Sequence, residues 1–521
     1  MTNQLKLINF PSLYLIFGAA CIVGIVVAWI NPGTIPFWGW LAGALLSIIC
    51  LLVLRWGWQI THSPARIAWI TLFAFFIRLV IGFTLFIALP LWGYDEEPPN
   101  HGYLYLDAYR RDSDAWLLAS SKSSLLTAFS QEFATDQYGG LLSLSAGIYR
   151  FLSPDLHRPL LILIITSFGT ALGVPFLWGA VKKRWDEPLA NLTTWLFTLY
   201  PESVILASSQ MREPFLIGFS ALSFWGIVYW QSDRKKAAWA MLASTIILTF
   251  FSLRASAALI TVLGIWFWLD HLQPKLTIKW QRTGWLAIGI LAIAGIAFGL
   301  HWLINTARWD LYLMETSSGR IQFELDAIGW QWRIPFIVSY GLLQPVLPAA
   351  IVYPGITIMR IIAIFRSIGW YAILPPLAFA FFAVWKQKPL SERRILAWFI
   401  IVVVIWTLVS SIRAGGDQWD NVRYRAIFTT WMALMAAWGY RHAKINRSAW
   451  LKRFYWVECI FVLVFLQWYL SRYLRLFGRL RFWHMILLII ALSMIILLIG
   501  WCLDARGRIK HTSLPRPHKP R

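Results

Sequence analysis

The chain has 521 residues, of which 59% are hydrophobic and only 14% are charged, and its mean hydropathy is +0.60. A water-soluble domain has about a quarter of its residues charged and cannot bury this much apolar surface in a single core. The composition therefore excludes a soluble protein and predicts an all-α fold, a polytopic bundle of transmembrane helices.

The net charge of +23 is distributed in short basic clusters between apolar runs, such as 182–184, 234–236 and 393–394. Cytoplasmic loops of membrane proteins carry this excess of lysine and arginine. A nucleic-acid partner would instead require one contiguous basic surface, so we expect none. The four cysteines lie within or at the end of apolar segments and are expected to be free thiols.

Apolar runs of about 17–25 residues, long enough to cross the hydrocarbon layer, recur along the chain. They predict about fourteen spans, with the N-terminus on the cytoplasmic side. In chain order the predicted spans are Leu13–Ile30, Phe37–Leu54, Ile67–Leu91, Leu160–Ala180, Leu189–Ala207, Phe215–Trp230, Ala237–Leu253, Ala255–Leu269, Trp285–Ile304, Trp370–Trp385, Ile395–Ile412, Ala426–Tyr440, Phe454–Leu470 and Trp483–Trp501.

This threading divides the chain into five parts. They are a two-span N-terminal extension (1–66), a core (67–304) with a large external loop (92–159), an external or re-entrant segment (305–368), a C-terminal bundle (369–502) and a basic cytoplasmic tail (503–521). The apolar piece 334–352 is expected to be re-entrant or interfacial, because prolines interrupt it and a further span would move the basic residues 386–394 outside.

The first polar segment of interest is 106–119, in the large external loop. Its carboxylates Asp107, Asp112 and Asp114 lie within eight residues of one another. Such a group can bind a divalent cation or supply a base whose pKa is set by its neighbours. The alternative is a solvated loop in which the aspartates pair with Arg110 and Arg111.

Two further segments add polar candidates on the same side. Asp136 and Tyr138 precede a glycine pair in the same loop, and a glycine pair suits either a ligand or a turn. Arg212 and Glu213 lie between Pro201 and the sixth predicted span. The prolines at 201 and 214 should break the helices there, and the Arg212–Glu213 pair is either functional or simply neutralised.

Arginines collect on this side as well. Arg254 lies in the turn between the seventh and eighth predicted spans, and Arg423 and Arg425 precede the twelfth. Their planar donor groups suit a phosphate or pyrophosphate, although lipid headgroups or snorkelling would explain them equally. Arg78, in the middle of the third span, is expected to form a structural ion pair.

The candidates come from separate segments, yet the threading places them all on the external side. Ionisable residues are costly at membrane depth, so this asymmetry favours an active site at the outer interface. The chain contains no phosphate-binding glycine loop with its lysine, no HExxH and no GxSxG motif. We therefore expect no nucleotide or redox cofactor. The glycine pairs 169/173 and 295/299 are typical of helix packing.

The segment 67–230 resembles the GT-C superfamily of lipid-linked-sugar glycosyltransferases, which includes protein O-mannosyltransferases and the lipid A aminoarabinose transferase. The resemblance rests on an early acid in the first external loop, then an aromatic and a small-residue helix turn with a Leu-Ala pair. The acid is Asp107, and Ala108 replaces the usual second acid. The other matching positions are Tyr109, Ala115, Leu118, Ala119, the stretch 136–140, Tyr200, Pro201 and Glu213.

The resemblance implies a polyprenyl-phosphate-linked sugar as donor and a glycan, lipid or protein as acceptor, at the outer face of a bacterial-type plasma membrane. Asp107 would be the general base, and arginines 212, 254, 423 and 425 would bind the donor phosphate. Glu213 and Asp136 would hold a divalent metal ion or position the substrate, with Asp112, Asp114 and Tyr138 in support.

Two other functions fit the same sequence. An O-antigen-type polymerase or ligase also has many spans, a large external loop and essential arginines, but does not depend on an early carboxylate. A lipid-linked glycan transporter or flippase would show paired halves and ionisable residues near the midplane. Only Arg78 lies near a midplane, and no internal duplication is evident.

Overall fold

The computed structural model describes residues 12–33, 35–133, 139–317, 329–352, 354–476 and 478–512, and every regular element in these ranges is helical. The first half contains α1 (Leu13–Ile30), α2 (Pro36–Ile60), α3 (Ala65–Trp92), η1 (Pro99–His101), α4 (Leu106–Ser120), η2 (Leu125–Phe129), η3 (Gln131–Phe133), α5 (Gly140–Leu152), α6 (Leu160–Arg184), α7 (Glu187–Leu199), α8 (Pro201–Ala207), α9 (Glu213–Tyr229) and α10 (Arg234–Phe251). The second half contains α11 (Leu253–Phe267), η4 (Trp268–Leu272), η5 (Gln273–Lys275), α12 (Ile278–Ser317), α14 (Trp330–Leu343), α15 (Leu347–Val352), α16 (Thr357–Ala383), η6 (Val384–Lys386), α17 (Leu390–Ala414), α18 (Asp420–Ala426), α19 (Thr429–Ile445), α20 (Trp450–Tyr473) and α21 (Phe482–Thr512).

The described residues contain nine helices that are long and apolar enough to cross a membrane, so the chain is an all-helical, multi-pass membrane protein. Five predicted spans lie outside these nine helices. One of them covers α7 and α8 together, and three others fall on α9, α10 and α19. Three of these have helices of at most 17 residues, and α10 carries three basic residues in its 18. The last, Trp285–Ile304, lies inside α12. The count of fourteen spans stays a prediction.

The predicted span Leu189–Ala207 is interrupted. Helix α7 ends at Leu199, and α8 begins at Pro201, the first helical position, where a missing backbone N–H costs nothing. Pro214 occupies the same kind of position at the start of α9. The prolines therefore break the helices as expected.

Helix α12 is longer than the predicted span Trp285–Ile304, because it continues to Ser317.

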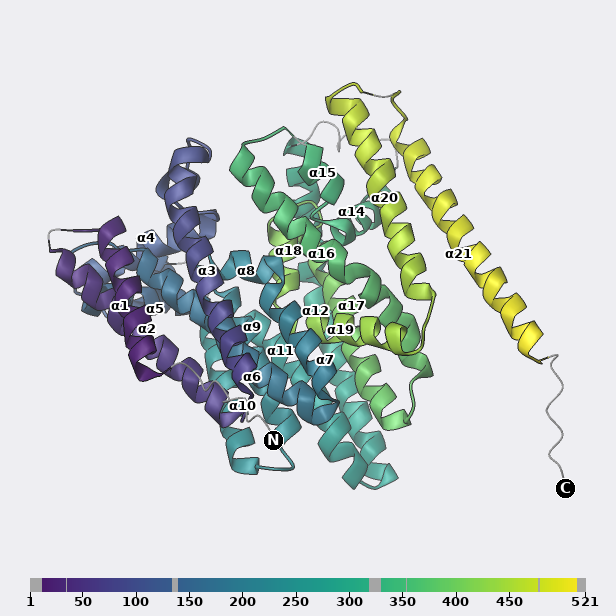
Figure 1. The fold of residues 1–521 in the computed structure, drawn as a ribbon, viewed down its shortest axis with the longest axis horizontal. Helices are drawn as coiled ribbons and strands as arrows, with labels where there is room; N and C mark the ends of the chain where they lie inside the picture. The colour runs from purple at the N-terminus through teal and green to yellow at the C-terminus, as the bar shows by residue number, and fades with distance from the viewer. Residues whose placement is uncertain are drawn as a thin grey trace, which may run out of the picture.

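Helix α6 forms the centre of the bundle and is buried along almost its whole length, between α2, α3, α7 and α9 (Figure 1). Helices α20 and α21 lie at the edge of the ribbon and have few buried residues. Helix α20 packs on the main core through Leu451, and a small second core around Phe465, Trp468 and Met485 joins it to α21. Their apolar outer surfaces are what a helix facing lipid requires.

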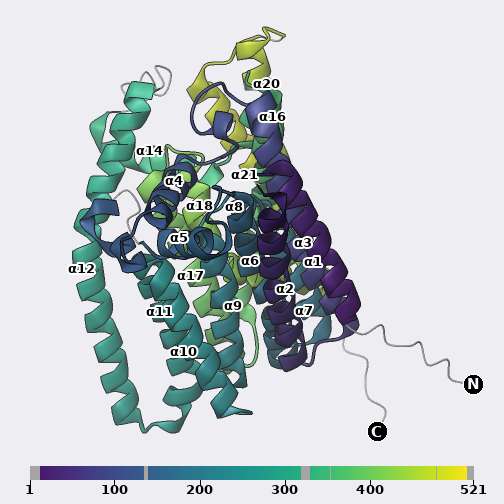
Figure 2. The same ribbon diagram turned by 90° about the vertical axis from the view of Figure 1, so that its left-hand side faces the viewer.

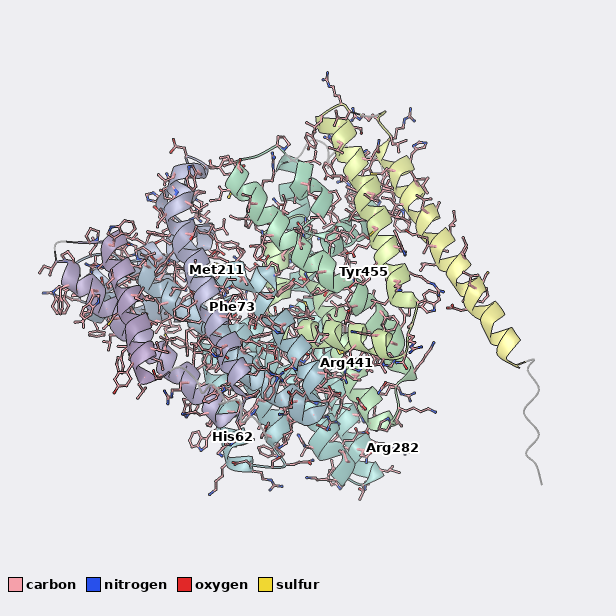
Figure 3. The ribbon with its side chains drawn as sticks, in the orientation of Figure 1. His62, Phe73, Met211, Arg282, Arg441 and Tyr455 are labelled. Carbon is pink, nitrogen blue, oxygen red and sulfur yellow. The ribbon has the colours of Figure 1, made fainter. Side chains whose placement is uncertain are left out.

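Basic residues lie in connections at both ends of the bundle. The connection from α20 to α21, with the arginines of 472–481, lies at the top of Figure 1. The connections from α6 to α7, from α9 to α10 and from η5 to α12 lie at one end, at the bottom of Figures 1 and 2, and carry the clusters 182–184 and 234–236 and Arg282. We call this the basic end. Figure 3 shows His62 and Arg282 there, whereas Met211 lies about midway up the molecule. Helices α4, α14 and α18 lie in the half opposite the basic end (Figure 2), which we call the site end.

Helices α6 and α9 pack through glycines, which tests one prediction from the sequence. A Cβ atom on Gly218 would lie 1.8 Å from the carbonyl oxygen of Gly169, and one on Gly173 would lie 3.0 Å from Cα of Gly218. The pair 169/173 thus packs as predicted. The pair 295/299 does not, because a Cβ atom at either position would meet nothing within 4 Å.

Replacing Gly218 by alanine is expected to force α6 and α9 apart and to lower the thermal unfolding midpoint, since the closest obstacle is rigid backbone. The matched control is Gly295→Ala, which adds the same methyl group to open space and should leave the midpoint unchanged or slightly higher. Thermal denaturation of the two purified variants in one detergent measures the difference. Equal midpoints would contradict the packing described.

Candidate functional site

Three segments that are distant in the sequence meet at the site end. Asp107 lies in the first turn of α4, Glu213 is the first residue of α9, and Arg423 lies in the short helix α18. Acidic side chains are favoured in the first turn of a helix, where the backbone N–H groups are unpaired. The chain thus supplies two carboxylates at helix starts, and α18 places an arginine between them.

Arg423 is the centre of this cluster. Its Nη1 donates a hydrogen bond to Oδ2 of Asp107 at 2.8 Å, and its Nε lies 3.5 Å from Oε1 of Glu213. Asp420, one turn earlier in α18, lies 3.4 Å from Nη1. Arg212 approaches Glu213 from the other side, with Nε at 3.9 Å from Oε1. We call Asp107, Arg212, Glu213, Asp420 and Arg423 the acid–arginine cluster.

The members of the cluster differ in exposure. The side chain of Asp107 is 59% exposed, whereas those of Arg423 and Glu213 are buried. Oε2 of Glu213 is buried and has no hydrogen-bond partner among the described residues. Partial burial works to raise the pKa of the Asp107 carboxyl, but the charge and hydrogen bond of Arg423 outweigh it, so that the pKa lies below its ordinary value. Asp107 is therefore an ionised carboxylate facing outward from a buried arginine.

A second ion pair lies next to this cluster and is fully buried. Arg366, in α16, donates from Nε to Oε2 of Glu202 at 2.6 Å and from Nη2 to Oε1 at 3.0 Å. The hydroxyl of Tyr105, just before α4, donates to Oε1 of Glu202 at 3.4 Å, and the Arg366 guanidinium lies 4.3 Å from the ring centre of Trp419. This pair ties α8 and α16 to the segments that carry Asp107 and Arg423.

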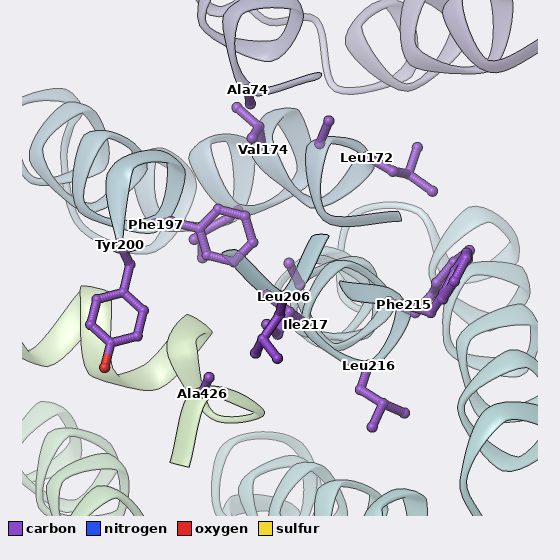
Figure 4. Packing of buried hydrophobic residues seen from close by; sticks show 14 of the residues in the cluster. Ala74, Leu172, Val174, Phe197, Tyr200, Leu206, Phe215, Leu216, Ile217 and Ala426 are labelled. Carbon is purple, nitrogen blue, oxygen red and sulfur yellow. The ribbon is translucent and has the colours of Figure 1, made fainter. Parts of the chain in front are cut away.

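Arg425 points away from the acid–arginine cluster, although it lies only two residues from Arg423. Its Nη2 donates to the carbonyl oxygen of Gln344 at 2.7 Å, and its guanidinium stacks 3.5 Å from the ring centre of Trp370. Figure 4 shows the side chain of Tyr200 directed toward the helix that carries Ala426. The charge of Arg425 is thus used inside the protein, at the break between α14 and α15.

Four buried arginines share this kind of partner. Each donates to a backbone carbonyl oxygen, which is at the C-terminal end of a helix for Thr198 and Gln344 and in a turn before a helix for Gln210 and Gln418. The pairs are Arg78 with Thr198, Arg111 with Gln210, Arg366 with Gln418 and Arg425 with Gln344. This corrects the expectation of an ion pair for Arg78: among the described residues it donates to the carbonyl oxygens of Ala74 and Thr198 and to the Ser203 hydroxyl, and not to a carboxylate.

Asp112, expected to support the site, has a separate role. It is buried on the face of α4 that packs against α5, and it accepts hydrogen bonds from the hydroxyls of Tyr103 at 2.6 Å and Tyr149 at 2.5 Å. Nε2 of His157 lies 2.8 Å from the same carboxylate. Three partners satisfy a buried carboxylate, so Asp112 holds the external segment together. Asp114, two residues later, is only partly buried.

The remaining predicted residues are Asp136, Tyr138 and Arg254. Asp136 and Tyr138 fall outside the described residues. Arg254 is exposed in the first turn of α11. The glycine pair that follows Tyr138 has a packing role: Gly139 has a φ of +64°, and a Cβ on Gly140 would lie 2.0 Å from the carbonyl oxygen of Phe250. The close approach here is between backbone segments, and it brings α5 against the end of α10.

Comparison of the chain with known protein families, with curated proteins and with solved structures finds no match. The function must therefore be argued from the cluster itself.

Sequence reasoning missed Arg366 and did not connect Glu202 to it. Arg366 was placed in an external segment, because the following span was expected to begin at Trp370, whereas α16 begins at Thr357. Reading the apolar run from Ile356 onward would have shown an arginine within a membrane-length helix. Such a residue needs a partner, and Glu202, after the predicted break at Pro201, is an acid in the same situation.

Arg423 lies between the carboxylates of Asp107 and Glu213 and contacts both, so these two acids are bridged by an arginine. Because Asp136 lies outside the described residues, a divalent metal ion held by Asp136 and Glu213 stays a prediction. Chemically, the arrangement offers one exposed, ionised carboxylate beside two arginines. A carboxylate can accept a proton, and arginines paired with carboxylates can rearrange to bind an incoming anion.

Proposed function

We propose that the protein is a membrane glycosyltransferase that moves a sugar from a polyprenyl-phosphate-linked donor to an acceptor hydroxyl. The observation that carries the proposal is the salt bridge between Asp107 and Arg423, which joins an exposed carboxylate to a buried arginine at 2.8 Å, in the half of the bundle opposite the basic end. A proton acceptor and an anion-binding group are the two requirements of a transfer whose leaving group is a phosphate.

In the proposed reaction the Asp107 carboxylate takes the proton of the acceptor hydroxyl as its oxygen attacks the anomeric carbon. The bond from that carbon to the donor phosphate breaks, and the lipid phosphate leaves with the electron pair. Attack from the face opposite the leaving group inverts the anomeric centre. Arg423 and Arg212 stabilise the charge that develops on the phosphate. Glu213, buried between the two arginines, keeps them in position.

The membrane arrangement supports the choice of donor. A polyprenyl chain lies in the bilayer with its phosphate at headgroup level, and the cluster lies in the half of the multi-pass bundle opposite the basic end. If the basic end is cytoplasmic, as basic loops usually are, the cluster faces the outside of a bacterial-type plasma membrane. An acceptor glycan, lipid or protein would then reach Asp107 from the external side.

The direct test is release of polyprenyl phosphate from a polyprenyl-phosphate sugar by the purified protein in liposomes, with an acceptor-bearing lipid extract present. We expect release and labelled acceptor without transport of the intact donor across the bilayer. Movement of uncleaved donor would support the transporter instead. No consumption of any polyprenyl-phosphate sugar, with extracts of several acceptors, would count against the proposal.

The pH dependence of this activity should identify the base. Asp107 works as a base only when ionised, so activity falls as the pH drops through its pKa, which Arg423 holds below the ordinary value of about 3.9. The wild type should therefore show no loss attributable to Asp107 between about pH 5 and 7. In the Arg423→Gln variant, residual activity should decline at a higher pH, because burial is no longer offset. A wild-type acid limb near neutrality would assign the base to another group.

A further inference from the structure

A crevice of about 360 Å³ lies at the basic end, in the opposite half of the bundle from the acid–arginine cluster. It is formed by the segment η4–η5, the start of α12 and the first turns of α17. Its walls are apolar, with Leu269, Trp285, Trp398 and Ile401 among them. Ligand pockets of proteins begin at about this volume. The indole N–H of Trp398 donates to the carbonyl oxygen of Val262 at 3.2 Å, which fixes one wall of the crevice.

The lining includes a single charged side chain, that of Arg394, which is exposed. Other cations lie close in the chain: Arg282 is one helical turn before Trp285, and Lys275 is two residues after the lining residue Gln273. Of the nearby acids, Asp270 already pairs with Arg184, at 3.1 Å. Glu392 is two residues before Arg394 and so projects from a different side of α17. The mouth of the crevice therefore has an excess of positive charge.

We propose that this crevice binds an anionic phospholipid. One acyl chain occupies the apolar interior, and the headgroup phosphate lies against Arg394 at the mouth, with Arg282 and Lys275 nearby. A soluble anion would not fill the apolar interior, and an uncharged lipid would not form an ion pair with Arg394. The pattern of an apolar slot with a cation at headgroup level is what a two-part ligand of chain and phosphate requires.

Such a lipid would join elements that the protein itself holds less firmly. Helix α6 is buried along almost its whole length, whereas the first turns of α12 are mostly exposed. These turns of α12 have α17 as their neighbour. An acyl chain between Trp285 on α12 and Ile401 on α17 would fill the space that separates these helices. Bound lipid should therefore stabilise the folded protein in proportion to its occupancy.

The experiment uses the full chain, purified in detergent and titrated with phosphatidylglycerol or phosphatidylcholine, with bound lipid counted by native mass spectrometry and the unfolding midpoint measured in parallel. Arg394→Ala removes the charge at the mouth, and Arg393→Ala is the matched control. Arg393 is the adjacent residue of equal charge, and its Nη1 donates to the carbonyl oxygen of Trp385 at 3.3 Å instead of lining the crevice. Ala397→Phe fills the slot while keeping every cation.

We expect one retained phosphatidylglycerol and a rise in midpoint that phosphatidylcholine does not reproduce. Arg394→Ala should weaken phosphatidylglycerol binding about fivefold, the effect of one cation near an anionic headgroup. Arg393→Ala should leave binding unchanged, and Ala397→Phe should abolish it. Equal binding of the two lipids, equal effects of the two arginine variants, or displacement by glycerol phosphate alone would each overturn the proposal. The outcome is independent of whether the protein transfers sugars.

Discussion

Replacing Asp107 by asparagine is expected to reduce sugar transfer by about 10²- to 10⁴-fold, the usual contribution of a general base. Asparagine keeps the size of the side chain and can still accept a hydrogen bond from Arg423, but it cannot take a proton. Because the Asp107 side chain is 59% exposed, the unfolding midpoint should change little. The measurement is the initial rate of polyprenyl-phosphate release in liposomes, with the midpoint recorded on the same preparation.

The matched control for this variant is Asp95→Asn, an exposed aspartate of the same external segment that lies outside the acid–arginine cluster. It should transfer sugar at the wild-type rate. An Asp107→Asn protein with full activity would remove the proposed mechanism and favour a polymerase or ligase, which relies on arginines without an early carboxylate. A loss of folding in the variant would show that Asp107 is structural.

The second large effect is expected from the buried pair of Glu202 and Arg366. Replacing Glu202 by leucine leaves the Arg366 guanidinium buried without its carboxylate, and removal of one partner of such a pair costs about 3–5 kcal/mol. Both side chains are at most 2% exposed, so solvent cannot compensate. We expect a large fall in the free energy of unfolding, measured by denaturant titration in detergent, and loss of transfer activity as α4 and α18 lose their common support.

Two comparisons make this prediction specific. In the double variant Glu202→Leu/Arg366→Met no charge is left buried, so much of the stability should return, apart from the hydrogen bonds of Arg366 to the carbonyl oxygens of Gln418 and Trp419. At the basic end, Glu187 pairs with Arg66 while both are about half exposed, and Glu187→Gln should cost at most about 1 kcal/mol. A single variant no less stable than the double one would contradict the account.

The sequence predicted the helices better than their boundaries. Apolar runs locate membrane helices because lipid leaves the backbone no other way to satisfy its hydrogen bonds. All fourteen predicted spans fall on helices, but nine of the described helices have the length and composition to cross. Hydropathy alone could not show that α12 continues past Ile304, since polar residues extend a helix beyond its apolar run. The start of α16, thirteen residues before Trp370, could have been predicted from the apolar run after Ile356.

The candidate site was predictable as a set of residues but not as a geometry. Asp107, Arg212, Glu213 and Arg423 were found because each is a polar residue beside a helix end on one side of the threading, and the structure brings these four together. The sequence could not predict the direction in which each side chain points. Arg423 and Arg425 lie on one short helix and have the same composition around them, yet they face different clusters, because α18 sits between α8 and the α14–α15 break.

Four buried arginines donate to backbone carbonyl oxygens, and this limits which arginines of the protein could bind a doubly negative ligand. A guanidinium that donates to a buried carbonyl oxygen replaces a water molecule as its hydrogen-bond donor. Moving the guanidinium would leave that oxygen buried without a hydrogen bond, which is costly. A guanidinium held by a carboxylate can exchange one anion for another. By this distinction the charges of Arg78, Arg111 and Arg425 are committed to carbonyl oxygens. Arg366 binds both a carboxylate and carbonyl oxygens, so it is held by both kinds of partner. The positive charge that is held by carboxylates and could exchange them for another anion is therefore concentrated in Arg423 and Arg212, beside Asp107.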